Sequence, residues 1–354
     1  MKNKINDLKI SNFKSIREAE LDCARINLFV GKPNVGKSNV LEAISLLGAK
    51  HNYNKDKFLS EFIRYESFGN LYHFYDTDHP IKVITNIGGA VIFNSYEFSE
   101  NELYLGPRQA IERQLIDMQR GSDFLDSNED RESEIKLSYV FISNNGKAGT
   151  LFSHGNYSPI KKYEFKKNQK IDFKEKSFLL PPFGKNLFSI LNSSKKLKSA
   201  IPELFNEYGF NFLIDVEENK FAIQRIENGI SYKIPYSLVA DTLQRIIFHY
   251  AAIFSNKDSV ILFEEPENHS FPPYIRELAL KIIESTDNQF FITTHSPYLF
   301  DTILENTPPE ELALFITYFE DYETKFKKLN DDDIAKIMNY GLEVFFNLNH
   351  FVDE

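Results

Sequence analysis

The sequence contains a single cysteine and no long apolar run, and each scarcity excludes a class of protein. One cysteine, Cys23, cannot form an intrachain disulfide. The longest apolar stretches are strand-sized, well short of the roughly 18 residues of a spanning helix, so we expect no membrane span. The opening MKNKINDLKISNF carries charges where a signal peptide has an apolar segment. We therefore expect a cytoplasmic protein.

An excess of basic charge is also missing. The 354 residues include 41 Lys and Arg against 51 Asp and Glu, which gives a formal charge of −10. This balance disfavours a protein whose whole surface is basic for binding nucleic acid or anionic lipid. The length suggests two domains or one large bilobed domain, and 42% apolar residues suffice for a substantial core.

Hydrophobic patterning predicts strands that lead into polar loops at both ends of the chain. The alternation over 8–23 predicts a half-buried hairpin, and the apolar run 26–30 predicts a strand that enters a glycine loop. Helical periodicity follows over 38–47. Near the C-terminus, the apolar strands 260–263 and 290–293 alternate with amphipathic helices, which indicates a parallel sheet with ligands at the carboxyl ends of its strands.

The glycine loop, GKPNVGKS at 31–38, matches the phosphate-loop pattern. In such a loop, backbone N–H groups surround a phosphate chain and the following helix adds a favourable dipole. Lys37 would reach the β and γ phosphates, and Ser38 would hold Mg²⁺. The alternative is a plain glycine turn between a strand and a helix. The predicted nucleotide-binding residues here are Gly31, Lys32, Pro33, Asn34, Val35, Gly36, Lys37, Ser38 and Asn39.

Two further polar clusters directly follow the predicted strands 260–263 and 290–293. Glu264 and Glu265 follow the first strand, and such a pair suits a phosphate site: one carboxylate can hold the Mg²⁺ shell while the next orients the attacking water. Taken alone, the pair is also typical of a solvated turn. His295 follows the second strand, where it could contact a γ-phosphate or have a purely structural role.

Together these motifs resemble the ATP-binding-cassette heads of the RecF, SMC and OLD (overcoming lysogenization defect) class. The matching segments are ISNFKSI, KSNVLEAI, EEPENHSFPP and TTHSPYLF, which lie within roughly 1–50 and 235–350. The resemblance implies an α/β P-loop NTPase fold: a bilobed head with a mixed sheet and an inserted helical subdomain. We expect a nucleotide-binding lobe over 1–105 and 255–354, and an inserted helical, signature-bearing lobe over 106–254.

The resemblance also implies roles for individual residues and implies ATP and Mg²⁺ as ligands. Lys37, Glu265 and His295 would be catalytic: Glu265 polarises the hydrolytic water and His295 is the switch histidine. Ser38 and Glu264 would hold the metal. The segment that contains Asn12, Lys14 and Ser15 lies beside the nucleotide in the class.

The sequence departs from this class in its signature motif. Heads of this class hydrolyse ATP as dimers, each completing the partner's site with a Ser-Gly signature at the start of a helix. The corresponding stretch here lacks the glycine and leaves Ser237, Asp241 and Thr242 as alternative trans contacts, so weak turnover is an open alternative. For the glutamine loop the sequence offers only Gln109 and Gln114.

The OLD nucleases carry a metal-dependent (Toprim) domain after the ATPase. Fewer residues follow His295 than such a domain needs, so we expect a stand-alone ATPase.

A lysine-rich segment concentrates positive charge in one place. Residues 161–198 contain eleven lysines and three carboxylates, a local charge of +8, and the remainder of the chain carries −18. Interleaving with Tyr163, Phe165 and Phe173 would suit phosphate contacts and base stacking on DNA. A solvated hairpin has the same alternation.

We interpret the sequence as a Mg²⁺-dependent ATPase head that dimerises around nucleotide, as a homodimer or an oligomer of dimers. The resemblance implies that it regulates a separately encoded effector, a nuclease or toxin, in prokaryotic anti-phage defence. The alternatives are a RecF-like repair ATPase that clamps DNA, and a weakly hydrolysing ATP-binding scaffold.

Overall fold

The structure is a computed structural model that contains two large packed sheets, with helices against both of them, and a small three-stranded sheet in a projecting lobe. It describes residues 1–51, 58–95, 100–119, 137–144, 146–152, 158–169, 176–340 and 344–352. The stretch 121–134, whose acidic and polar sequence predicts a loop, lies outside these residues. No helix in the described ranges is both long enough and apolar enough to cross a membrane.

The central sheet has six strands in the order β16-β15-β3-β14-β13-β9. All neighbouring pairs are parallel except β15 and β16, so the predicted mixed sheet is confirmed. Its inner strands are buried on both faces, as their continuous apolar runs predict. The strands are β3 (Ile26–Gly31), β9 (Ile160–Tyr163), β13 (Val260–Glu264), β14 (Gln289–Thr293), β15 (Leu312–Glu320) and β16 (Glu323–Lys328).

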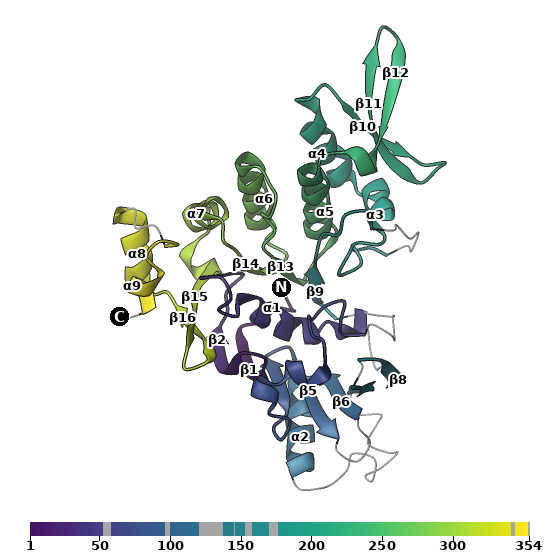
Figure 1. Ribbon diagram of the computed structural model, residues 1–354. Coiled ribbons are helices and arrows are strands. Elements are labelled where there is room, and N and C mark those ends of the chain that lie inside the picture. The colour runs from purple at the N-terminus through teal and green to yellow at the C-terminus, as the bar shows by residue number, and fades with distance from the viewer. Residues whose placement is uncertain are drawn as a thin grey trace.

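An antiparallel sheet of seven strands packs below it, with the predicted hairpin at one edge in the order β2-β1-β4-β5-β6-β7-β8. Helix α1 (Lys37–Leu46) contacts strands of both sheets, and helix α2 (Arg108–Gln119) packs on β5 and β6 (Figure 1). The strands are β1 (Asp7–Phe13), β2 (Ile16–Asp22), β4 (Ile81–Thr85), β5 (Gly88–Ser95), β6 (Glu100–Gly106), β7 (Ser138–Ser143) and β8 (Ala148–Phe152).

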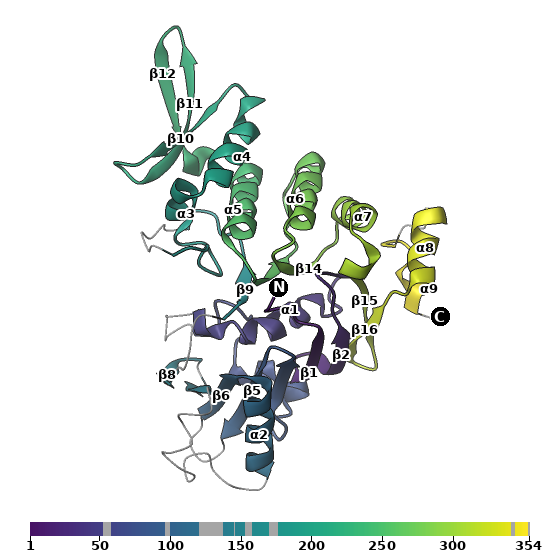
Figure 2. The same ribbon diagram turned by 180° about the vertical axis from the view of Figure 1, so that it is seen from behind.

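Helices cover the other face of the central sheet, and beyond them a small lobe projects from the body (Figures 1 and 2). The covering helices are α5 (Asp241–Ser255), α6 (Pro272–Glu284) and α7 (Pro297–Asn306). The lobe contains α3 (Leu187–Ser193), α4 (Lys195–Asn206), β10 (Asn211–Asp215), β11 (Lys220–Glu227) and β12 (Ile230–Pro235). Helices α8 (Asp331–Tyr340) and α9 (Leu348–Val352) lie near the C-terminus. Single 3-10 turns span Ala49–His51, Phe68–Leu71, His73–Tyr75, Tyr236–Leu238 and Pro309–Glu311.

The structure moves the lower boundary of the inserted lobe. We expected this lobe to span 106–254, but β7 and β8 extend the antiparallel sheet and β9 pairs with β13 in the central sheet. The helical lobe therefore begins only after β9. The division into a nucleotide-binding lobe and an inserted lobe stays a prediction, and all four residues of β9, including its two lysines, are buried.

Candidate nucleotide-binding site

The glycine loop joins β3 to α1, and two of its glycines are sterically required. A Cβ on Gly31 would lie 2.1 Å from the carbonyl oxygen of Thr317 on the neighbouring strand β15. Gly36 has φ +91°, and its Cβ would lie 2.1 Å from Thr324 Oγ1. The Thr324 hydroxyl also donates to the Val35 carbonyl at 2.8 Å. Strands β15 and β16 therefore lie so close to the loop that residues 31 and 36 must be glycine.

Lys37 begins α1 and lies across the loop. Its ammonium donates to the carbonyl oxygens of Lys32 at 2.7 Å and Gly31 at 3.1 Å, and its side chain is buried. Burial lowers the pKa of Lys37 to about 8, while the carboxylate of Glu265 acts in the opposite direction. The loop thus holds a cation at the start of a helix, where both charge and dipole favour a phosphate.

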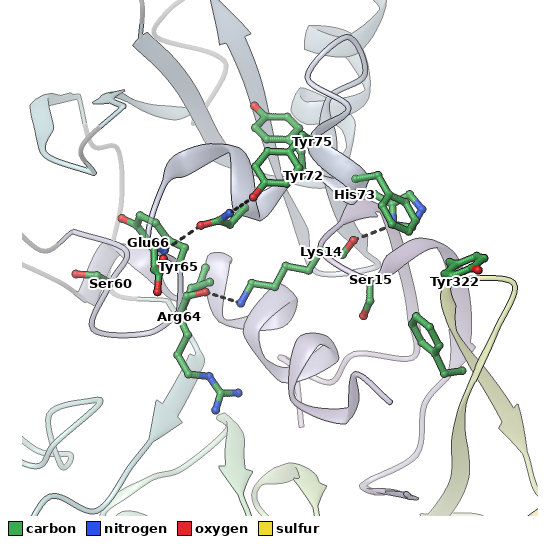
Figure 3. Close-up of a pocket in the computed structure, with 14 residues that line it drawn as sticks. Lys14, Ser15, Ser60, Arg64, Tyr65, Glu66, Tyr72, His73, Tyr75 and Tyr322 are labelled. Atoms are coloured by element: carbon green, nitrogen blue, oxygen red, sulfur yellow. Dashed lines mark hydrogen bonds between the residues drawn. The ribbon is translucent and has the colours of Figure 1, made fainter. Parts of the chain in front are cut away.

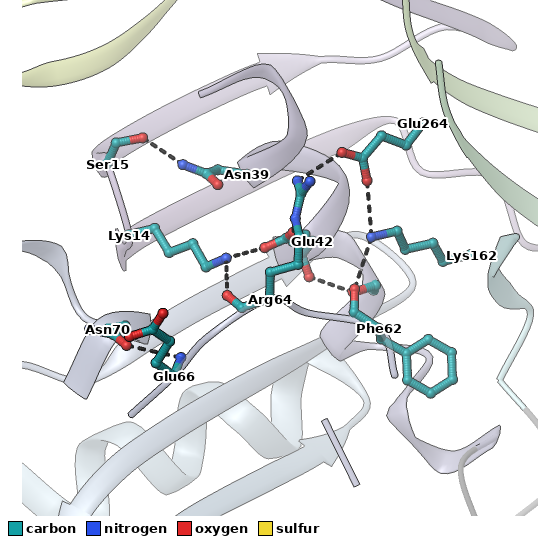
Figure 4. Close-up of polar contacts among 11 residues, drawn as sticks. Lys14, Ser15, Asn39, Glu42, Phe62, Arg64, Glu66, Asn70, Lys162 and Glu264 are labelled. Atoms are coloured by element: carbon teal, nitrogen blue, oxygen red, sulfur yellow. Dashed lines mark hydrogen bonds and ion pairs between the residues drawn. The ribbon is translucent and has the colours of Figure 1, made fainter. Parts of the chain in front are cut away.

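Glu264 ends β13 near the Ser38 hydroxyl, which favours the ionised form of its carboxyl. Its Oε1 also accepts from the Arg64 guanidinium at 2.8 Å, and its Oε2 lies 3.2 Å from the Lys162 ammonium (Figure 4). Burial would raise the pKa of this carboxyl, but Lys162, Ser38 and Arg64 together lower it, so it is ionised at neutral pH. A hydroxyl beside an ionised carboxylate is a donor pair that suits Mg²⁺, which takes its remaining ligands from phosphate and water.

A chain of alternating charges extends from Glu264. Arg64 also donates to Glu42 on α1 at 2.8 Å, and Glu42, whose side chain is fully buried, pairs with Lys14 (Figure 4). Sequence reasoning missed Arg64 altogether and assigned Lys162 to the basic patch. Pairing of β9 with β13 would have indicated the contact, because it places Lys162 opposite Leu262, two residues before Glu264.

Glu265 and His295 follow neighbouring parallel strands and face each other. Nε2 of His295 lies 3.4 Å from Oε1 of Glu265. Burial lowers the pKa of His295, the charge of Lys37 lowers it further, and Glu265 opposes both. The imidazole is therefore neutral at neutral pH. A neutral histidine next to a glutamate can donate one hydrogen bond, and a glutamate side chain can serve as a general base.

Of the residues expected beside the nucleotide, Lys14 and Ser15 lie close to the glycine loop and Asn12 does not. Ser15 contacts Asn39 and Thr324 around the loop, at 2.7 and 2.6 Å between the polar side-chain atoms. Lys14 is held by Glu42 and by the Arg64 carbonyl oxygen. In contrast, the Asn12 side-chain amide donates to the carbonyl oxygens of Asp76 and His79 and accepts from the His73 N–H. Asn12 therefore holds a neighbouring loop, and the structure does not place it among the phosphate-loop contacts.

A cavity of about 820 Å³ opens beside Lys14 and Ser15, with Arg64 on its other side (Figure 3). Six of its fourteen lining residues are phenylalanine or tyrosine. Of these, Phe74, Tyr75 and Tyr322 are more than half exposed. The cavity had no counterpart in the sequence analysis, because its lining comes from segments near residues 14, 60–75 and 319–322.

The signature candidates lie at the start of α5 and make contacts within their own chain. Asp241 pairs with Arg245 at 2.9 Å and lies 3.8 Å from Lys167. The Thr242 hydroxyl donates to the His269 carbonyl at 2.7 Å, and Ser237 is exposed in a 3-10 turn. Of the three, Ser237 alone has an exposed side chain that makes no hydrogen bond or ion pair with the described residues.

The structure does not bring the two glutamine-loop candidates to the carboxyl ends of the central strands. Gln109 and Gln114 lie on α2, which packs on β5 and β6 of the antiparallel sheet. The strand that enters the helical lobe from the site is β9, and the side chain it delivers to Glu264 is Lys162.

The lysine-rich segment does not form one exposed patch. Lys161 and Lys162 are 5% and 3% exposed; Lys161 donates to Ser259 Oγ at 2.8 Å and stacks over Phe178. The Tyr163 ring is buried as well. The alternatives of DNA contact and of a solvated hairpin are therefore both wrong for these three side chains, because β9 is the edge strand of its sheet but all four of its residues are buried. Lys170, Lys174 and Phe173 lie outside the described residues.

The fold and these contacts define a P-loop ATPase. Residues 26–301 match the family described as "AAA domain, putative AbiEii toxin, Type IV TA system", and the chain belongs to this family. A Helicobacter pylori protein named ATP/GTP phosphatase is 22% identical over 376 residues, which cover 97% of this chain and 98% of that protein.

Solved structures of SMC heads are also similar. An SMC head bound to the C-winged helix domain of ScpA is 16% identical with a TM-score of 0.48, covering 94% of this chain and 99% of that chain. The SMC head from Thermotoga maritima is 12% identical with a TM-score of 0.40, covering 92% and 99%.

Proposed function

We propose that this chain is a Mg²⁺-dependent ATPase head that dimerises around ATP and regulates a separately encoded effector. The observation that carries the proposal is the meeting of four side chains at the carboxyl ends of three adjacent parallel strands. Lys37 follows β3, Glu264 and Glu265 follow β13, and His295 follows β14. Together they offer a cation, a pair of carboxylates and an imidazole, the groups that phosphoryl transfer uses.

Hydrolysis would use these groups in one displacement. A water oxygen adds to the γ-phosphorus as the bond to the bridging β-oxygen breaks, and Glu265 accepts the proton of the water. Lys37 stabilises the charge on the β and γ phosphates, and the neutral His295 donates a hydrogen bond to a γ oxygen. Mg²⁺, held by Ser38 and Glu264, supplies further charge neutralisation when bound. The products are ADP and inorganic phosphate.

The site is tested by phosphate release. We expect the purified chain to release phosphate from ATP in the presence of Mg²⁺. Release should stop when excess EDTA removes the metal, because Ser38 and Glu264 without Mg²⁺ cannot neutralise the charge of the phosphates. Restoring Mg²⁺ should restore the rate. Equal release with and without Mg²⁺ would contradict the role given to this pair.

The aromatic cavity supports nucleotide binding at the same place. Phosphates in the loop would leave the nucleoside near Ser15, which lines the cavity. Exposed aromatic rings such as Tyr322 and Tyr75 offer the stacking surface that a purine base uses.

Three exposed apolar side chains support dimerisation through the face that carries the motifs. Leu238 precedes α5, Phe271 follows the two glutamates, and Tyr298 follows His295; they are 73%, 61% and 58% exposed. Each sits within a few residues of one motif. A partner that covers the motifs would remove these side chains from water.

Replacing Phe271 by aspartate should weaken ATP-dependent dimerisation by at least about tenfold, because a charge would be buried in the interface. Phe346, which is 84% exposed near the C-terminus, provides the matched control Phe346→Asp. Sedimentation with ATP in the Glu265→Gln background measures both. Unchanged dimerisation of Phe271→Asp would place the interface elsewhere.

The family description supports a role beside an effector. It names a putative toxin and a toxin–antitoxin system, and we infer that closure and reopening of the ATP-bound dimer regulate a nuclease or toxin in anti-phage defence. Purification from the native operon, followed by identification of the product of the adjacent gene, identifies this partner.

One observation favours slow ATP hydrolysis by this site. Both oxygens of Glu264 already accept from or pair with cations, Arg64 and Lys162. Mg²⁺ must compete with them for this carboxylate.

A further inference from the structure

A buried carboxylate joins the loop that carries Glu265 to the turn that carries His295. Oε1 of Glu267 accepts from the Thr294 hydroxyl at 2.6 Å and from the His295 N–H at 2.8 Å. Glu267 is 7% exposed and Thr294 is fully buried, so water does not compete for these hydrogen bonds. They fix the backbone of the switch histidine to the loop of the catalytic glutamate.

The same loop holds Glu265 in a constrained position. Glu265 has φ +44°, in the left-handed region that is unfavourable for residues other than glycine. Its N–H donates to the Thr293 carbonyl at 3.0 Å, and the Asn268 amide donates to its Oε2 at 2.8 Å. These contacts leave Oε1 as the oxygen that faces His295.

The far end of the loop is attached to α5, the covering helix that packs against α3 and α4 of the small helical lobe. The Thr242 hydroxyl at the start of α5 donates to the carbonyl of His269, which itself has φ +57°. The loop from 265 to 269 therefore has two anchors, one on α5 and one on the turn after β14. A displacement of α5 relative to the central sheet would pull on this loop.

Burying the polar side chain of Glu267 costs folding free energy, which indicates that this side chain has a role besides filling space in the core. Its second oxygen, Oε2, is buried and has no hydrogen-bond partner among the described residues. A buried unsatisfied acceptor destabilises the folded state. The two hydrogen bonds of Oε1 offset this cost, and both go to the turn that positions His295.

We propose that Glu267 is a positioning residue that sets His295 against Glu265, and that the Thr242–His269 hydrogen bond transmits the position of the helical lobe to this pair. The inference rests on the proposed ATPase function and deepens it. It assigns to Thr242 a role within its own chain, in place of the trans contact expected from the sequence. The helical lobe would thereby control when the catalytic pair is aligned.

The test separates kcat from nucleotide affinity. Glu267→Ala should lower kcat about 10- to 100-fold, with the KM for ATP and the Kd of a non-hydrolysable ATP analogue changing less than about threefold, because two hydrogen bonds to the switch turn are lost while the phosphate loop is untouched. Glu267→Gln, which retains an acceptor oxygen, should recover most of kcat.

Threonine variants test the same contacts without removing the carboxylate. Thr294→Val should lower kcat about tenfold, and Thr242→Val should lower it while Thr242→Ser recovers it. Thr302, also buried and hydrogen-bonded to a backbone carbonyl on α7, provides the matched control Thr302→Val with wild-type kcat. These variants keep the test valid if Glu267→Ala does not fold.

Two results overturn the inference. One is wild-type kcat in both Glu267→Ala and Thr294→Val; the other is a parallel loss of kcat, nucleotide affinity and melting temperature, which marks a purely structural contact. Absence of phosphate release by the wild-type chain would instead overturn the proposed function itself.

Discussion

Replacing Glu265 by glutamine is expected to lower kcat for ATP hydrolysis by at least about 100-fold while ATP binding persists. The amide keeps the size of the side chain and its contact with Asn268 but cannot accept the proton of the attacking water. ATP should therefore stay bound, and the dimer formed around it should accumulate. Phosphate release under single-turnover conditions, together with the Kd of ATP, measures the two effects separately.

Glu284→Gln is the matched control for this substitution. Glu284 lies at the end of α6 in an exposed ion pair with Lys281, remote from the loop. Its variant should hydrolyse ATP at the wild-type rate. If Glu265→Gln also retained the wild-type rate, another group would have to accept the proton.

Lys37→Ala is expected to weaken ATP binding by about 100-fold, because the loop loses charge-assisted hydrogen bonds to phosphate. The fold should persist, since the ammonium contacts only loop carbonyls that water can satisfy. Calorimetric titration measures the affinity and thermal unfolding measures the fold. Lys9→Ala, at an exposed ion pair on β1, should bind ATP as the wild type does. Unchanged affinity in Lys37→Ala would refute the phosphate-loop assignment.

The pKa of Lys37 adds a pH dependence to its role. With a pKa of about 8, the ammonium is mostly charged at pH 7 and mostly neutral at pH 9. Phosphate binding favours the charged form, so ATP affinity should fall as the pH rises through 8, by up to about tenfold per pH unit. Lys37→Ala should lose this dependence.

The parts of the site that lie within one short segment of the chain were predictable from the sequence. A strand, a glycine loop and a helix follow one another within 26–47, and polar residues directly follow two apolar strands near 264 and 295; each pattern lies within one short segment. The order of the parallel strands then brought these segments to one edge of a sheet, as general rules for such sheets predict.

Contacts between distant segments were not predictable in this way. Arg64 and Lys162 reach Glu264 from segments about 200 and 100 residues away, and neither carries a motif. Thr242 was one of three alternatives for a contact to the partner's nucleotide, and nothing in the sequence indicated that its hydroxyl donates to the His269 carbonyl. For Lys162 the charge itself was misleading, because lysine normally indicates an exposed position.

The position of β3 in its sheet has a consequence for how the chain folds during synthesis. Its two neighbours, β14 and β15, are made more than 250 residues later, and β16, whose Thr324 supports the glycine loop, comes later still. Pairings of such long sequence separation form slowly and late. The glycine loop leaves the ribosome early but lacks its support until the last strands are complete. We therefore expect a nascent chain to be unable to bind nucleotide, or to pair with a second copy, until synthesis has passed β16.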